Sequence, residues 1–138
     1  GYMQARQLGD NTRATLITRG LAEMTRFSVA LGASEHTLFG LSGLGDLLAT
    51  CNSPLSRNYQ VGYRLAQGQT VEQILSELKM VAEGIRTTYA VCKIADQHQI
   101  DTPIVKQIEQ ALKSNAFSEE LIIKSLMSRK LKSEETRV

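Results

Sequence analysis

Hydrophobic residues in this chain of 138 residues recur at intervals of three and four positions rather than at every second position. Intervals of three and four place side chains on one face of an α-helix, whereas strict alternation is typical of a β-strand. Proline occurs only at positions 54 and 103, so few helices would be interrupted. The pattern predicts an all-α fold, with about seven helices in one domain over residues 1–138 and order over about residues 9–128.

Capping residues, glycines and prolines set the predicted helix boundaries. Ser53 followed by Pro54 is typical of a cap and a proline in the first turn of a helix, and residues 70–73 have the sequence of a capping box. The predicted helices are residues 11–31, 34–39, 43–51, 55–66, 71–78 and 84–98, a helix that starts at Pro103, and a last segment capped by Ser118 that frays after about Lys130.

Each predicted helix has an apolar face that we expect to be buried. In the first helix, the polar residues Glu23 and Arg26 fall away from that face. The expected inward positions, helix by helix, are Leu16, Ile17, Leu21, Met24 and Ser28; Val71, Ile74, Leu75 and Leu78; Ile85, Tyr89, Cys92 and Ala95; and Ile104, Ile108 and Leu112.

The composition is that of a globular protein, because 42% of the residues are hydrophobic and 22% are charged. No segment approaches the roughly 18 consecutive apolar residues of a membrane-spanning helix, and no signal peptide is visible. Cys51 and Cys92 are the only cysteines and do not form a C-x-x-C pair. We therefore expect a cytoplasmic protein without a membrane span.

Charge and histidine placement argue against two classes of function. The net charge of +2 is too small to indicate nucleic-acid binding, and no aromatic residues interleave with the basic C-terminal cluster. That cluster consists of Lys124, Arg129, Lys130 and Lys132. His36 and His98 lack partner ligands at metal-binding spacing, so we expect no metal site.

A consecutive hydroxyl, guanidinium and amide stand near the predicted start of the fourth helix, as Ser56, Arg57 and Asn58. A helix N-terminus presents unpaired N–H groups and the positive end of the helix dipole, and arginine can bind two phosphate oxygens at once. These residues could therefore bind a phosphate. The alternative is that a serine caps the helix while the other two side chains are solvated, and composition alone favours it.

Two carboxylates are further candidates. Asp46 follows the glycines at 40, 43 and 45 and could bind a hydroxyl or an ammonium, or simply favour a helix start. Glu83 could likewise reach a ligand hydroxyl or cap a helix. The glycine order is G-x-x-G-x-G, the reverse of the dinucleotide fingerprint, and no strand is predicted before it. The chain therefore has no Rossmann signal of its own.

Four segments, taken together, resemble the C-terminal domain of the bacterial NAD(P)-dependent glycerol-3-phosphate dehydrogenases. Residues 9–24 resemble the long helix that opens that domain, and residues 40–48 resemble its glycine-rich turn. Residues 55–58 and 81–87 resemble two further family segments. They occur in the family's order, so the resemblance extends over about residues 9–110.

The resemblance implies both a fold and an activity. The fold would be similar to the 6-phosphogluconate dehydrogenase C-terminal domain-like fold, as the helical substrate domain. The parent enzyme would reduce dihydroxyacetone phosphate to sn-glycerol 3-phosphate with NAD or NADP as cofactor, for glycerophospholipid synthesis. Carried over by motif, the substrate-binding residues are Asp46, Ser56, Arg57 and Asn58, and the cofactor-binding residues are Arg57, Val81 and Glu83.

The same resemblance places the catalytic lysine shortly before Gly1. It also places the Rossmann domain, which binds most of the cofactor, in an N-terminal region outside this chain. We therefore expect no catalytic residue within the chain and no activity from the chain alone. Family members commonly dimerise, so a second copy is an expected partner beside the small-molecule substrate. The alternatives are a domain of a 6-phosphogluconate or ketopantoate reductase relative, or a free-standing helical interaction module.

Overall fold

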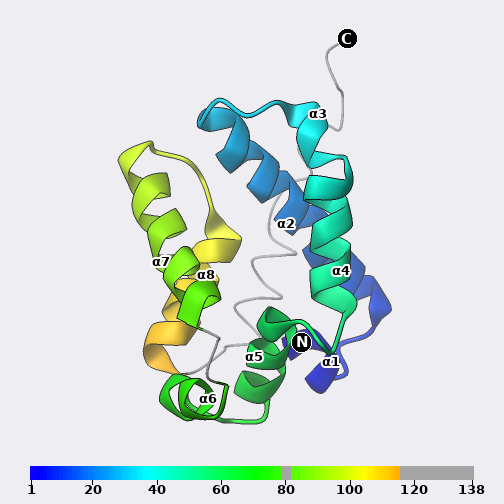
Figure 1. Cartoon of the computed structure of the whole chain (residues 1–138), viewed down its shortest axis with the longest axis vertical. Coiled ribbons are helices and arrows are strands. Elements are labelled where there is room, and N and C mark those ends of the chain that lie inside the picture. The colour runs from blue at the N-terminus through cyan, green and yellow to red at the C-terminus, as the bar shows by residue number, and fades with distance from the viewer. Residues whose placement is uncertain (79–81, 116–138) are drawn as a thin grey trace.

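The computed structural model describes residues 1–78 and 82–115. In these ranges it contains eight α-helical segments, one π-helical turn and no strand, which confirms the predicted all-α fold (Figure 1). The elements are α1 (Tyr2–Ala5), α2 (Asp10–Ala30), α3 (Glu35–Leu38), η1 (Leu41–Gly45), α4 (Asp46–Asn52), α5 (Arg57–Ala66), α6 (Val71–Glu77), α7 (Ala82–Gln97) and α8 (Pro103–Ser114).

The observed boundaries differ from the predicted ones at three places. α1 was not predicted, and it packs against α5. The contact is close at Gly62, since a Cβ added there would lie only 3.0 Å from the backbone nitrogen of Tyr2. The predicted helix 43–51 is divided into η1 and α4. α5 begins at Arg57 rather than after Ser53. The segment predicted from Ser118 lies outside the described residues.

The helices form two groups that are joined by α5 and α6 (Figure 1) and that also meet directly where α2 contacts the start of α8. On one side α2 contacts α3 and α4, and on the other α7 packs against α8. Within the described ranges, no helix combines the length and the apolar character needed to cross a bilayer.

The hydrophobic core is centred where α5 meets α6. Val61 and Ile74 are buried there, and half-buried hydrophobic side chains from α5, α6 and α7 pack around them. Thr70 forms the predicted capping box with Gln73, which starts α6 so that Ile74 points into this core. On α7 and α8 the inward positions Cys92, Ala95 and Leu112 are buried as predicted, and Ile85, Tyr89, Ile104 and Ile108 are half-buried.

A carboxylate of α2 caps the start of α8. Glu23 is only 3% exposed, although the sequence pattern placed it away from the buried face. Its two carboxylate oxygens accept hydrogen bonds from the backbone N–H groups of Ile104 and Val105, each at 2.9 Å. Those groups have no partner within the helix, and the N-cap Thr102 makes no side-chain capping bond. Glu23 therefore takes the place of a local cap, and its carboxylate interacts favourably with the positive end of the α8 dipole.

We expect Glu23→Ala to lower the free energy of unfolding of this domain by about 3 kcal/mol, because two partly buried N–H groups would lose their carboxylate acceptor. Urea denaturation followed by circular dichroism measures the change. The control is Glu35→Ala, which removes an exposed carboxylate from α3 and should change stability by no more than about 0.5 kcal/mol. Equal effects of the two substitutions would show that the Glu23 cap is unimportant.

Candidate functional site

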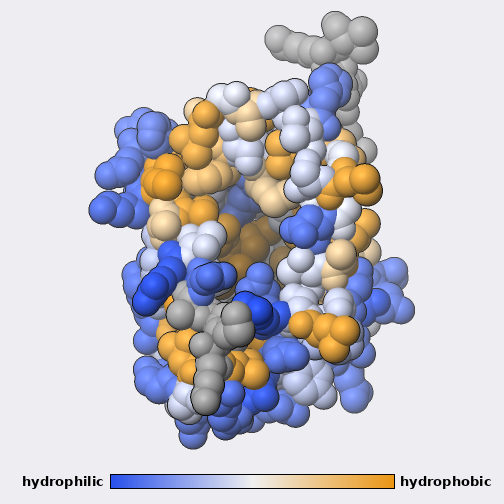
Figure 2. All heavy atoms as spheres, in the orientation of Figure 1, coloured by the Kyte–Doolittle hydropathy of each residue, from blue (hydrophilic) through white to orange (hydrophobic). Residues whose placement is uncertain are grey.

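A cavity of about 790 Å³ lies between α5, α7, α8 and the first residues of the chain. Figure 2 shows its opening as a hollow in the face of the molecule, with hydrophobic side chains at its floor. Its hydrophobic wall is formed by Val61, Leu65, Ile85, Ile104, Ile108 and Leu112 together with Met3 and Leu16. Its polar side chains belong to Ser56, Arg57, Asn58, Glu83, Thr87, Thr88, Gln107 and Tyr2.

The start of α5 supplies three of these polar side chains. Ser56 is the N-cap, and its Oγ accepts a hydrogen bond from the backbone N–H of Tyr59 at 3.4 Å. The predicted cap, Ser53, instead accepts from the N–H of Leu55 at 3.2 Å, within a turn that precedes the helix. Because the cap is Ser56, three residues after the predicted cap, Arg57 and Asn58 are the first two residues of the helix.

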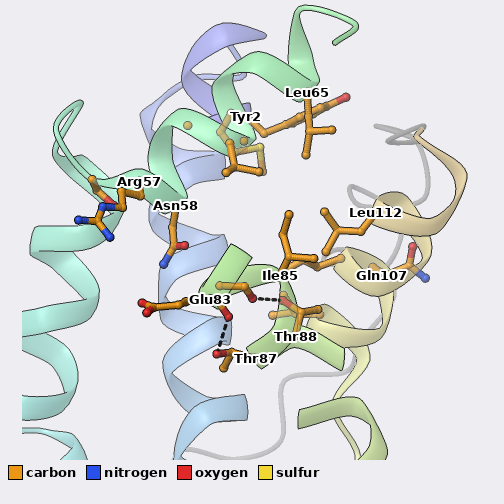
Figure 3. A pocket seen from close by; sticks show the side chains of 18 of the residues that line it. Tyr2, Arg57, Asn58, Leu65, Glu83, Ile85, Thr87, Thr88, Gln107 and Leu112 are labelled. Carbon is orange, nitrogen blue, oxygen red and sulfur yellow. Dashed lines mark hydrogen bonds between the residues drawn. The ribbon is translucent and has the colours of Figure 1, made fainter. Parts of the chain in front are cut away.

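The start of α7 supplies the opposite polar side of the cavity. Glu83 and Gly84 are its second and third residues, and the Glu83 side chain is exposed. The hydroxyls of Thr87 and Thr88 donate to the backbone carbonyls of Glu83 and Gly84, at 2.8 and 3.0 Å. Figure 3 shows Arg57, Asn58 and Glu83 at one end of the cavity, and Leu65 and Leu112 at the other.

Two helix N-termini thus meet at the polar end of the cavity. Each contributes backbone N–H groups and the positive end of a helix dipole, and Arg57 adds a full positive charge. Glu83 adds a carboxylate that can accept hydrogen bonds from hydroxyl or amide groups. The arrangement can bind a small molecule that carries both an anionic group and hydroxyls.

The structure brings together four of the six predicted site residues: Ser56, Arg57, Asn58 and Glu83 all line the cavity. Asp46 is the exposed first residue of α4 and is not among the lining residues. Val81 lies outside the described residues. Among the residues that the structure describes, no group of three or more His, Cys, Asp or Glu side chains could hold a metal ion.

Sequence reasoning missed several lining residues. Thr87 and Thr88 follow Glu83 by about one turn of α7, so helical spacing could have found them. Gln107 lies on α8 and joins the site only because α8 packs against α7. No local signal marks that contact.

The family model of the NAD-dependent glycerol-3-phosphate dehydrogenase C-terminus matches residues 1–123. The chain belongs to this family. The match includes the described cavity residues, all of which fall within those bounds. It confirms the resemblance and decides against the 6-phosphogluconate and ketopantoate reductase alternatives.

Curated relatives agree with the family model. The chain is 51% identical over 134 residues to a glycerol-3-phosphate dehydrogenase [NAD(P)+] of Acaryochloris marina, covering 97% of this chain and 43% of the relative. Proteins of the same name from Citrifermentans bemidjiense and Methylobacillus flagellatus are 49% and 48% identical, covering 91% and 97% of this chain and 37% and 40% of the relatives. The chain thus spans about two fifths of the length of these relatives.

We expect Ser56→Ala to destabilise the domain by about 1 kcal/mol, because it removes the acceptor that caps α5. Ser53→Ala is the matched control and should cost no more than about 0.5 kcal/mol, since Ser53 accepts only in the preceding turn. Thermal or urea unfolding measures both. A larger loss for Ser53→Ala would place the cap where the sequence pattern put it.

Proposed function

We propose that this chain is the substrate-binding domain of an enzyme that interconverts dihydroxyacetone phosphate and sn-glycerol 3-phosphate with NAD(P)H, in glycerophospholipid synthesis. The observation that carries the proposal is the convergence of Ser56, Arg57, Asn58 and Glu83 on one end of a single cavity, in a chain of this family. A doubly charged phosphate ester with neighbouring hydroxyl and carbonyl groups matches that polar end in charge and in hydrogen bonding.

In the proposed complex, the substrate phosphate lies at the start of α5. Arg57 donates two parallel hydrogen bonds to phosphate oxygens through its guanidinium group. Ser56 already accepts from the N–H of Tyr59, so its own hydroxyl proton is free to be donated to a phosphate oxygen. Asn58 donates from its carboxamide. These hydrogen bonds offset the charge of the phosphate and hold the substrate in one orientation, which lowers the entropic cost of the reaction.

Asp46 has a separate proposed role, because it lies outside the lining of the cavity in this domain. In the complete protein, it would hydrogen-bond a substrate hydroxyl or the catalytic ammonium group at the edge of the site. The resemblance places that lysine before Gly1. Gly1, Tyr2 and Met3 line the cavity beside α5, which supports a position for the lysine next to the substrate. The lysine would donate the proton that neutralises the developing alkoxide.

NAD(P)H, when bound, supplies the hydride for the carbonyl carbon. Two side chains of this domain fit one edge of such a cofactor. Arg57 can donate to an anionic or carbonyl oxygen, and Glu83 can accept from a hydroxyl or carboxamide. The described residues contain no strand and no glycine-rich strand-to-helix turn that would bind a pyrophosphate. We therefore propose that a Rossmann domain in the rest of the parent holds most of the cofactor, with Val81 as a further contact.

We also propose a cytoplasmic location and a homodimeric parent. The thiols of Cys51 and Cys92 are both free, and burial raises the pKa of each, which keeps them protonated and slow to oxidise. Free thiols of this kind fit a reducing compartment. The homodimer rests on the resemblance alone.

We expect the 138-residue chain alone to have no dehydrogenase activity, because the proposed proton donor and most of the cofactor site lie outside it. The measurement is the loss of NADH and of NADPH absorbance with dihydroxyacetone phosphate, with the complete protein as positive control. Measurable turnover by the chain alone would contradict this division of the active site.

In the complete protein, we expect Arg57→Ala to lower kcat/KM for dihydroxyacetone phosphate about 100-fold, mainly through a higher KM, because the phosphate loses two charge-assisted hydrogen bonds. Arg57→Lys should recover only part of the loss, since an ammonium group lacks the two-pronged geometry. Lys93→Ala removes an exposed cation from α7, outside the cavity, and serves as control. An unchanged KM and kcat/KM in Arg57→Ala would refute the phosphate assignment.

A further inference from the structure

A glycine stands in the first turn of α7, directly opposite the start of α5. Gly84 is the third residue of α7. A Cβ built on it would lie 2.4 Å from Oδ1 of Asn58 and 3.4 Å from its Cγ. The Asn58 carboxamide thus occupies the space that any side chain at position 84 would fill. Figure 3 shows this amide directed toward the start of α7.

Backbone conformation does not explain the glycine at position 84. Gly9, Gly32 and Gly68 have positive φ angles, which favour glycine, but Gly84 has helical geometry that every L-residue adopts. Glycine is also unfavourable within a helix compared with alanine. What distinguishes Gly84 is its contact with the side chain of a proposed substrate ligand. Gly20 of α2, in contrast, has nothing within 4 Å of a built Cβ.

We infer that Gly84 is a positioning residue for Asn58: its missing side chain lets the Asn58 carboxamide lie against the start of α7, aimed at the polar end of the cavity. The inference rests on the proposed function, in which Asn58 binds the substrate. A methyl group at position 84 would meet only the end of an exposed, flexible side chain, so Asn58 would rotate away while the helices stay in place. Substrate binding would weaken although the fold is kept.

The test is a double-mutant cycle in the complete protein, with Gly84→Ala, Asn58→Ala and the double variant, and with Gly20→Ala as the matched glycine control. We expect Gly84→Ala to raise KM for dihydroxyacetone phosphate about tenfold, the order of one hydrogen bond to a charged group, with kcat within about twofold. Its melting temperature should equal or exceed that of the wild type. Gly20→Ala should leave KM and kcat unchanged.

The cycle separates positioning from general damage. If Gly84 acts through Asn58, Gly84→Ala has no further effect on KM in the Asn58→Ala background. Two results would overturn the inference: effects of the two substitutions on KM that multiply, or a melting temperature of Gly84→Ala that falls while its KM rises. If Asn58→Ala raises KM but Gly84→Ala does not, the inference alone is wrong. If Asn58→Ala leaves KM unchanged, the substrate role of Asn58 fails, and the inference fails with it.

Discussion

The buried carboxylate of Glu23 fixes where α8 begins, and through α8 it fixes one wall of the cavity. Its two hydrogen bonds to the N–H groups of Ile104 and Val105 join residues 81 and 82 positions apart in the sequence. Arg26, one turn later on α2, donates to the carbonyl of Asp101 at 2.9 Å and strengthens the same junction. A buried charge is costly unless it is fully hydrogen-bonded, so α2 and α8 can pack in this register but not in a shifted one.

With α8 held in this way, the candidate site is formed by the meeting of α5 and α7. Each helix turns its N-terminus to the same end of the cavity, so two helix dipoles and Arg57 favour an anion there. The hydrophobic side chains beyond them form the opposite end of the cavity. This division into a polar and an apolar end favours the orientation that we propose for the substrate, with its phosphate at the start of α5.

Much of the architecture could be predicted from the sequence because it depends on local chemistry. The three- and four-residue spacing of hydrophobic positions gave the helices, and the capping box at Thr70 gave the start of α6. Local signals misplaced α5, since Ser53 and Pro54 are a sound cap sequence but Ser56 is the residue that caps the helix. They also assigned Glu23 to a polar face, because nothing nearby in the sequence indicates that α8 lacks a cap of its own.

The sequence by itself determined the all-α class, the family and the residue types available to bind a phosphate, since these depend on periodicity and on motifs of a few consecutive residues. Only the tertiary structure decided which of those residues meet. It places Glu83 beside Ser56, Arg57 and Asn58, leaves Asp46 outside the cavity lining, and sets the Asn58 amide against Gly84. Contacts between residues about 25 positions apart follow from the packing of whole helices, and a pattern of a few consecutive residues does not indicate how helices pack.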